Sequence, residues 1–119
     1  MARVHELRAL HRPLICTEYM ARGAGSTFDA ILPLGKREHV ALMNWGFIAG
    51  KTQTYFPWDS WYHPYVISQP EVWFHEIFRQ DGTPYRKHEV ELIRYYTGRG
   101  AALSDAERKE LQESTVLLP

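Results

Sequence analysis

The clearest candidate for chemistry in this chain is Glu18, which follows an apolar run with no turn residue between them. The run, residues 12–17, reads Arg-Pro-Leu-Ile-Cys-Thr and predicts a buried strand that leads directly into the carboxylate. Side chains at the carboxyl ends of parallel strands gather at one edge of a sheet, which is where α/β enzymes place their catalytic groups. Glu18 is therefore either a catalytic carboxylate, held as a nucleophile at the edge of a sheet, or a solvated glutamate at the end of a strand.

Aromatic residues supply the second chemical feature. A second apolar run, residues 39–47, contains Trp45, and a loop across residues 45–84 follows that is rich in aromatic and turn residues. Sugars bind by stacking their C–H faces on aromatic rings while polar groups hold the hydroxyls. The alternative is that Trp58 and Trp61 pack the loop against the second strand. The aromatic side chains are Trp45, Tyr55, Trp58, Trp61, Tyr62 and Tyr65, and the polar ones between them are Lys51, Gln53, Asp59 and His63.

These residues need a scaffold, and the pattern predicts a strand at about 13–17, a helix, and a strand at about 39–44. Ser26-Thr27-Phe28-Asp29 has the form of a capping box that opens the helix, while Pro33 should interrupt it and Gly35 should end it. A strand, helix and strand at this spacing form a βαβ unit with parallel strands, which places Glu18 and Trp45 at the same end. Tyr19 should point to the opposite face from Glu18 and pack there if the strand continues, whereas a turn at this point would bring its hydroxyl into the site.

Apolar spacing predicts two further helices, at residues 3–10 and 85–97, the second with Val90, Ile93 and Tyr96 on one face and closed by Gly98 and Gly100. Residues 1–100 thus form one α/β unit. Residues 101–119 form a charged helical tail, opened by a second capping box at residues 104–107. A two-stranded unit leaves both strand edges unpaired, so we expect a homo-oligomer.

Composition excludes several classes of partner. With 14 basic and 14 acidic residues the net charge is zero, which argues against nucleic acid or an anionic membrane. Cys16 is the only cysteine, so no intrachain disulfide can form, and a buried apolar role is expected. The histidines lack the spacing of a zinc site, so we expect neither a metal nor a cofactor. No signal region or apolar stretch of about 20 residues is present, which predicts a cytoplasmic protein.

Several of these pieces, in their order and spacing, resemble one enzyme family. Residues 11–97 resemble the carboxy-terminal quarter of the cellulase-like (β/α)8 glycoside hydrolases of clan A, which comprises the seventh and eighth strand units. The resemblance implies a partial TIM barrel with two parallel strands and flanking helices. It also implies that Glu18 is the nucleophile and that Trp45 floors a sugar subsite. The matching motifs are Thr17-Glu18-Tyr19, Asn44-Trp45-Gly46, the loop Gly50-Lys51-Thr52-Gln53-Thr54, and Pro57-Trp58-Asp59-Ser60-Trp61.

The chain also departs from that family. A retaining β-glycosidase of this clan needs a second glutamate, following an asparagine, and no Asn-Glu pair occurs in this chain. The chain has 119 residues, whereas a full barrel takes about 250. The acid/base would come from another chain, from Asp59, or from Glu76, which is otherwise a solvated side chain or a hydrogen-bond acceptor. Two hypotheses remain: a retaining β-glycosidase acting on an oligosaccharide or β-glycoside, and a catalytically inactive carbohydrate-binding fragment of one. The predicted substrate contacts are Trp45, Lys51, Gln53, Trp58, Asp59 and Trp61.

Overall fold

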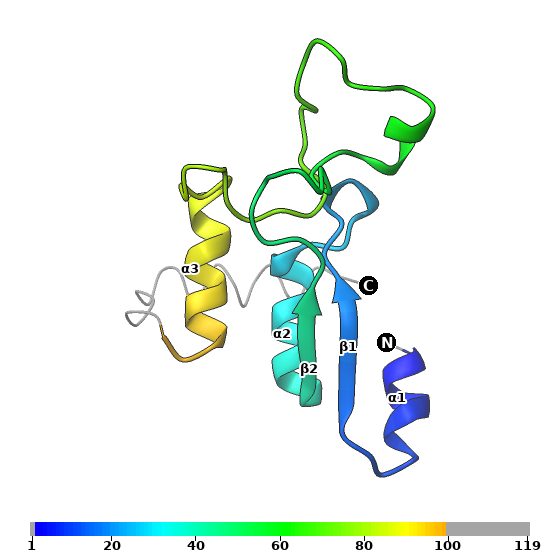
Figure 1. The fold of residues 1–119 in the computed structure, drawn as a ribbon. Helices are drawn as coiled ribbons and strands as arrows, with labels where there is room; N and C mark the ends of the chain where they lie inside the picture. The colour runs from blue at the N-terminus through cyan, green and yellow to red at the C-terminus, as the bar shows by residue number, and fades with distance from the viewer. Residues whose placement is uncertain (1, 100–119) are drawn as a thin grey trace.

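A computed structural model describes residues 2–99, which fold into a small α/β unit with an open, two-stranded parallel sheet (Figure 1). The predicted tail at residues 101–119, with its capping box, and the predicted closing Gly100 lie outside the described residues. Within the described part, no helix is long and apolar enough to cross a membrane. The main elements are α1 (Ala2–Arg8), β1 (Leu14–Tyr19), α2 (Phe28–Glu38), β2 (Val40–Asn44) and α3 (Lys87–Tyr96).

The predicted βαβ unit is confirmed, with β1 and β2 parallel and α2 packed on one face of the sheet (Figure 1). Along each strand, half-buried side chains alternate with exposed ones, as expected when a single face of a sheet is covered. Ile15, Ala41 and Met43 point to the face without a helix, where Ile15 remains 62% and Met43 59% exposed. The described residues therefore form an open sheet with one bare apolar face, and they do not close a barrel.

A β-bulge near the end of β1 changes which way Glu18 points. Cys16 pairs with Leu42 and Tyr19 pairs with Asn44, so two residues of β1, Thr17 and Glu18, lie opposite the single residue Met43. Such a bulge shifts the alternation of side chains by one position. Thr17 and Glu18 are consequently both exposed.

Tyr19 turns back toward the helix-covered face and packs edge-on against Phe28, with ring centroids 5.9 Å apart. The prediction that Tyr19 packs on the face opposite Glu18 is confirmed.

Helix α2 is longer than the sequence predicted. Thr27, one residue into the predicted capping box, is the N-cap and accepts a hydrogen bond from the Ala30 amide. The helix then continues through Pro33 and Gly35 to Glu38, so the predicted interruption and the predicted end are both wrong. Burial of Phe28 and Leu32 on one face holds the helix together despite the missing proline N–H, because packing of an apolar face contributes more to helix stability than propensity does.

Gly35 serves close packing instead of ending the helix. A Cβ at this position would lie 2.4 Å from Leu42 Cδ1 on β2, so only glycine lets the helix approach the strand so closely. The helix ends at His39, whose φ of 54° is left-handed and whose amide donates to the Gly35 carbonyl.

The two outer helices differ in how they are held. Helix α1 contains no buried residue and ends at Arg8, before the predicted end at residue 10. Helix α3 spans residues 87–96 of the predicted 85–97, and Val90, Ile93 and Tyr96 pack against the core as predicted. The chain then turns at Gly98, whose φ is 71°.

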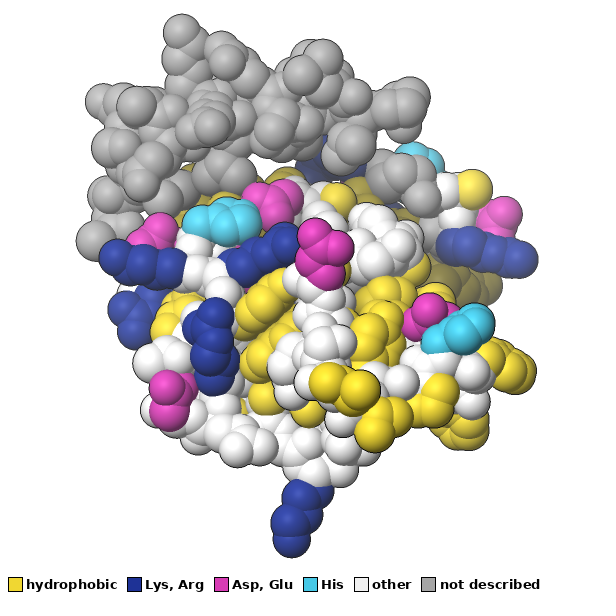
Figure 2. Space-filling view, turned by 90° about the horizontal axis from the view of Figure 1, so that it is seen from above, with side chains coloured by type: hydrophobic (Ala, Val, Ile, Leu, Met, Phe, Trp, Pro, Cys, Tyr) yellow, Lys and Arg dark blue, Asp and Glu magenta, His cyan; other side chains and the backbone are white. Residues whose placement is uncertain are grey.

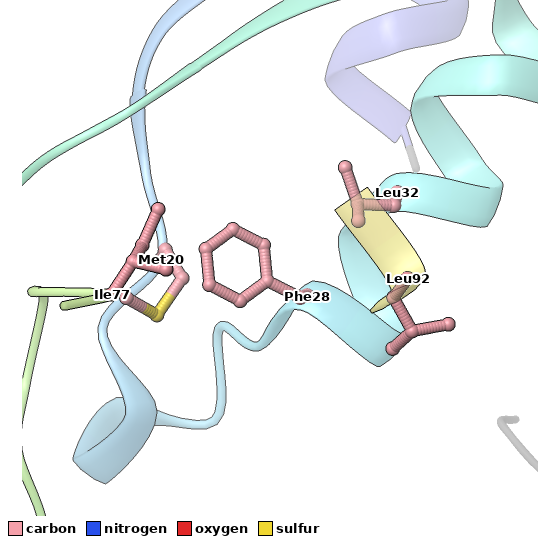
Figure 3. Packing of buried hydrophobic residues seen from close by; sticks show 5 residues of the cluster. All are labelled: Met20, Phe28, Leu32, Ile77 and Leu92. Carbon is pink, nitrogen blue, oxygen red and sulfur yellow. The ribbon is translucent and has the colours of Figure 1, made fainter. Parts of the chain in front are cut away.

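The core lies where the end of β1 meets α2, α3 and the returning loop. In Figure 3 the Phe28 ring lies between Met20 and Ile77 on one side and Leu32 and Leu92 on the other. Ile77 belongs to the loop, so burying it anchors the loop to the βαβ unit.

The predicted long loop between β2 and α3 is confirmed, and it rises above the carboxyl ends of both strands (Figure 1). Its regular structure is limited to one short 3-10 helix, Trp58–Trp61. Its two ends are joined where the amides of Ile77 and Phe78 donate to the Phe47 carbonyl and Ala49 donates to Phe78. Seen from above, patches of hydrophobic side chains lie across the middle of this end of the molecule, and Lys and Arg side chains lie mainly toward its edges (Figure 2).

Candidate functional site

A hollow of about 310 Å³ lies at the carboxyl ends of the two strands and contains both residues that the sequence singled out. Glu18 from β1 and Trp45 from the residue after β2 line it together, as their positions in parallel strands predicted. We call it the strand-end hollow. Its lining residues are Glu18, Tyr19, Met20, Ala21, Ser26, Trp45, Trp58 and His75.

The backbone behind Glu18 is strained and held in place from both sides. Met20, fully buried, has a φ of 73°, in the left-handed region that a side chain with a Cβ disfavours. Its amide donates to Ser26 Oγ at 3.2 Å, and its carbonyl lies 2.6 Å from His75 Nδ1. Such strain persists only where the surroundings determine it, and it is enriched at functional sites.

His75 is a titratable lining residue that the sequence analysis did not place in the site. The residue is 6% exposed, and Nδ1 must carry a proton because a carbonyl oxygen such as that of Met20 can only accept a hydrogen bond. The backbone of the residue after Trp45 allows the close approach, because a Cβ on Gly46 would lie 2.9 Å from His75 Cβ. The sequence signals available were a histidine, His75, and a glycine, Gly46, just after the second strand. Because the loop separates them in the sequence, their contact could not be predicted.

The predicted aromatic contacts divide into two groups. Trp45 is 46% exposed and lines the hollow together with Trp58 and His75. Trp58 lines the hollow and also packs edge-on against Phe74 at 5.1 Å, so it serves both the loop and the hollow. Trp61 is 88% exposed and lies outside the lining.

The remaining predicted contacts, Lys51, Gln53 and Asp59, are exposed side chains of the loop and do not line the hollow. Among the described residues, Glu18 is the only carboxylate in its lining.

Glu76 is not the solvated side chain that the sequence allowed. It is fully buried, and Oε1 accepts a hydrogen bond from the Thr54 hydroxyl, so the alternative role as an acceptor is confirmed. Oε2 has no hydrogen-bond partner within residues 2–99. The side chain is absent from the lining of the strand-end hollow, so it does not share a cavity with Glu18.

A buried ion pair between Arg22 and Glu89 holds the segment that carries His75. Arg22 contacts Glu89 of α3 through two hydrogen bonds, Nε to Oε1 at 2.8 Å and Nη2 to Oε2 at 2.5 Å, with both side chains about 1% exposed. Arg22 also donates to the carbonyls of Trp73 and Glu76, on either side of His75. The arginine therefore fixes the segment that carries His75, although its partner is 67 positions away and nothing local in the sequence indicates the pair.

Aromatic stacking reinforces this arrangement. The Trp73 and Tyr85 rings are parallel, with centroids 4.6 Å apart, and the Arg22 guanidinium lies 4.8 Å from the centre of the Tyr85 ring. The segment before His75 is thereby tied to the start of α3 by both ring stacking and a cation–π contact.

The Tyr19 phenol, which lines the hollow, has a raised pKa, and the nearby Cys16 thiol makes a hydrogen bond to the backbone. Burial, and to a lesser extent the neighbouring Cys16, raises the pKa of Tyr19 from 10.0 to about 12, so this phenol stays neutral at physiological pH. Cys16 is half-buried, less than predicted, and its thiol donates to the Glu18 carbonyl at 3.2 Å. Across residues 2–99, no three His, Cys, Asp or Glu side chains gather in a way that could hold a metal ion.

No protein-family model, no curated protein and no solved structure matches the chain. A functional assignment therefore rests on the residues of this chain and on their geometry.

Proposed function

We propose that the strand-end hollow binds a β-linked sugar and that Glu18 is the nucleophile of retaining β-glycosidase chemistry. The observation that carries this proposal is that Glu18 and an exposed Trp45 ring line one hollow at the carboxyl ends of two parallel strands. Trp45 would stack on the sugar ring next to the scissile bond, with Trp58 beside it. Lys51, Gln53, Asp59 and Trp61, on the rising loop, would contact sugar units further out.

In this reaction the Glu18 carboxylate attacks the anomeric carbon and the glycosidic C–O bond breaks, which leaves a glycosyl ester on Glu18. The departing oxygen takes a proton from a general acid. Water, deprotonated by the same group, then hydrolyses the ester and restores the carboxylate. The β-bulge of β1 contributes by turning Glu18 to the bare face of the sheet, which is the interior side in a (β/α)8 barrel.

Residues 2–99 of a single chain place no second carboxylate beside Glu18 in the hollow, so the general acid has to come from elsewhere. Retaining chemistry requires two carboxyl groups about 5–5.5 Å apart, and Glu18 is the only carboxylate that residues 2–99 place in the lining. We therefore include in the proposal that copies of the chain associate through the bare apolar face and the free strand edges, as parts of a larger barrel-like assembly. A neighbouring copy would then supply the second carboxylate.

The second candidate function is carbohydrate binding without hydrolysis. The same observation favours it, because one carboxylate and a free tryptophan suffice to bind a sugar but not to cleave it. The two candidates make the same prediction for Trp45 and opposite predictions for turnover.

Turnover of 4-nitrophenyl β-glycosides, tested as a panel of glucoside, xyloside, mannoside and galactoside, separates the two. If the chain is a hydrolase, Glu18→Gln abolishes release of nitrophenol, whereas Glu91→Gln, an exposed carboxylate on α3, leaves it unchanged. Release by the Glu18→Gln protein at the unmutated rate would exclude Glu18 as nucleophile. Binding of oligosaccharide without any release would establish the second candidate.

Sugar binding is tested with Trp45→Ala. Loss of a stacking ring costs roughly 1–3 kcal/mol, or about one to two decades of affinity. Because nearly half of the ring is exposed, the melting temperature should change little. Unchanged affinity together with a large drop in melting temperature would instead assign Trp45 to the packing of the loop.

A further inference from the structure

We propose that His75 is a substrate-binding residue of the strand-end hollow, whose Nε2 accepts a hydrogen bond from a hydroxyl of a neutral sugar. The inference rests on the proposed function and adds to it the group that recognises a sugar hydroxyl beside Glu18. The observations behind it are the hydrogen bond at Nδ1, the place of the ring in the lining, and the unused nitrogen.

The protonation of the ring follows from its contact with Met20. The Met20 carbonyl accepts the hydrogen bond from Nδ1 at 2.6 Å, so Nδ1 bears the proton. In a neutral imidazole the other nitrogen is then an acceptor. Within residues 2–99, Nε2 has no hydrogen-bond partner, although the ring lines the hollow. We take Nε2 as the acceptor that a ligand in the hollow would reach, because His75 lines the hollow and Nδ1 is already bonded.

The ring is also held in one orientation. Phe74 packs edge-on against it at a centroid distance of 5.6 Å, and the Trp58 ring lies 6.2 Å away. Arg22 fixes the backbone on both sides through the carbonyls of Trp73 and Glu76. A side chain held this firmly loses little entropy when it binds a ligand, which is the general advantage of a preorganised site.

The chemistry of the lining selects the ligand. The charged group in the lining is the Glu18 carboxylate, which is likewise an acceptor when ionised. Two acceptors beside an indole ring match a ligand that presents hydroxyl donors and an apolar ring face, as a neutral sugar does. An anionic ligand would meet the carboxylate without any cationic side chain in the lining.

Two substitutions separate the two ring nitrogens. His75→Asn places an amide N–H where Nδ1 is and can keep the bond to the Met20 carbonyl, but it removes the acceptor at Nε2. His75→Gln places its amide near the position of Nε2 and gives up the bond to Met20. We expect His75→Asn to weaken binding about 3–10-fold, the value of one hydrogen bond, with little change in melting temperature. His75→Gln should bind more tightly than His75→Asn and melt at a lower temperature.

The experiment is calorimetry of all three proteins with cellotriose, xylotriose and mannotriose, combined with long-range ¹H–¹⁵N spectra of the imidazole. The spectrum of the unmutated protein should show the proton on Nδ1, and the Nε2 signal should shift when the bound trisaccharide is added. A proton on Nε2 in the free protein, or equal affinity of His75→Asn and the unmutated protein, would overturn the inference and leave the proposed function intact. If none of the trisaccharides binds the unmutated protein, the proposed function fails and the inference fails with it.

Discussion

Glu89 is a carboxylate almost without contact with water, and Arg22 is what makes its burial possible. The pair joins the chain after β1 to α3, and the guanidinium holds two carbonyls of the loop at the same time. Removal of one member leaves a buried charge without a partner. Glu89→Gln should therefore lower the free energy of unfolding by about 3–5 kcal/mol.

A second, more exposed arginine near Glu89 provides the control for this prediction. Arg86 also approaches Glu89, at 3.7 Å, but its side chain is 41% exposed, so Arg86→Ala should cost only about 0–1 kcal/mol. Urea unfolding of both variants measures the difference. Equal losses would show that Arg22 and Glu89 do not form the dominant pair.

At the scale of single residues, the sequence could place Glu18 and Trp45 at one end of the molecule because both follow predicted strands. It could not place His75, which reaches the hollow through a loop and is fixed by Arg22 and by Met20. Contacts between segments more than 50 positions apart leave no periodic signal in the chain. Four predicted substrate contacts on the loop lie outside the lining of the hollow: Lys51, Gln53, Asp59 and Trp61.

Among the elements, the contact between α2 and β2 depends on one glycine. Gly35→Ala would bring a methyl group to 2.4 Å from Leu42 Cδ1 and 2.8 Å from Leu42 Cγ, so the helix has to move away from the strand. Alanine favours a helix by about 1 kcal/mol over glycine, but overpacking costs about 1–3 kcal/mol, so we expect a net loss of stability.

A double-mutant cycle tests this origin of the loss. Leu42→Ala alone should destabilise the protein through its cavity, whereas Gly35→Ala added to Leu42→Ala should no longer destabilise it, because the clashing atoms are gone. Additive effects would mean that the glycine matters for another reason.

Helix α1 makes no buried contact and is held to α2 through Glu38. Arg8 donates to Glu38 Oε2 at 2.8 Å, and Arg37 donates to Oε1 at 3.0 Å. The hydrogen bond from Arg37, and then that from Arg8, lowers the pKa of Glu38 below its ordinary 4.5, in spite of an opposing contribution from desolvation. A carboxyl whose pKa is lower in the folded state stabilises the fold above its unfolded pKa, and this contribution is lost as the pH falls through the folded value.

Glu38→Gln should consequently lower the urea midpoint at pH 7 and lose its effect near pH 2–3, where the unmutated carboxyl is protonated too. Glu91→Gln, on the exposed side of α3, is the control and should change neither midpoint. If the deficit of Glu38→Gln persists at low pH, packing of the side chain and not its charge holds α1.

At this scale the sequence predicted the order of elements well, because apolar periodicity records which face of a helix or strand is buried. The parallel βαβ unit, the long loop and the inward face of α3 all followed from it. The end of α2 did not, since local rules treat proline and glycine as breakers. Here the burial of Phe28 and the close contact of Gly35 with Leu42 decide the outcome.

Across residues 2–99, many large apolar side chains are exposed. In addition to the side chains on the bare face of the sheet, Leu10 is 65% exposed. On the loop, Tyr62 and Val66 are each 84% exposed and Ile67 is 99% exposed. A further hollow of about 580 Å³ opens between α2, β2 and α3. Where such exposed apolar side chains form a patch, they commonly mark an interaction site, which is consistent with the proposed association of copies.

The bare face of the sheet is the part of this surface that a barrel-like assembly would bury, and two lysines can test it. Ile15 and Met43 lie on neighbouring strands of that face and make few contacts within the chain, so Ile15→Lys with Met43→Lys should leave the fold intact. In an assembly each lysine would be a buried charge without a partner, which costs several kcal/mol. Analytical ultracentrifugation should therefore show an oligomer for the unmutated protein and a monomer for the double variant. Ile67→Lys, on the outer loop, is the matched control and should stay assembled. A cooperatively melting monomer in the unmutated protein would exclude assembly, and with it any general acid supplied by a neighbouring copy.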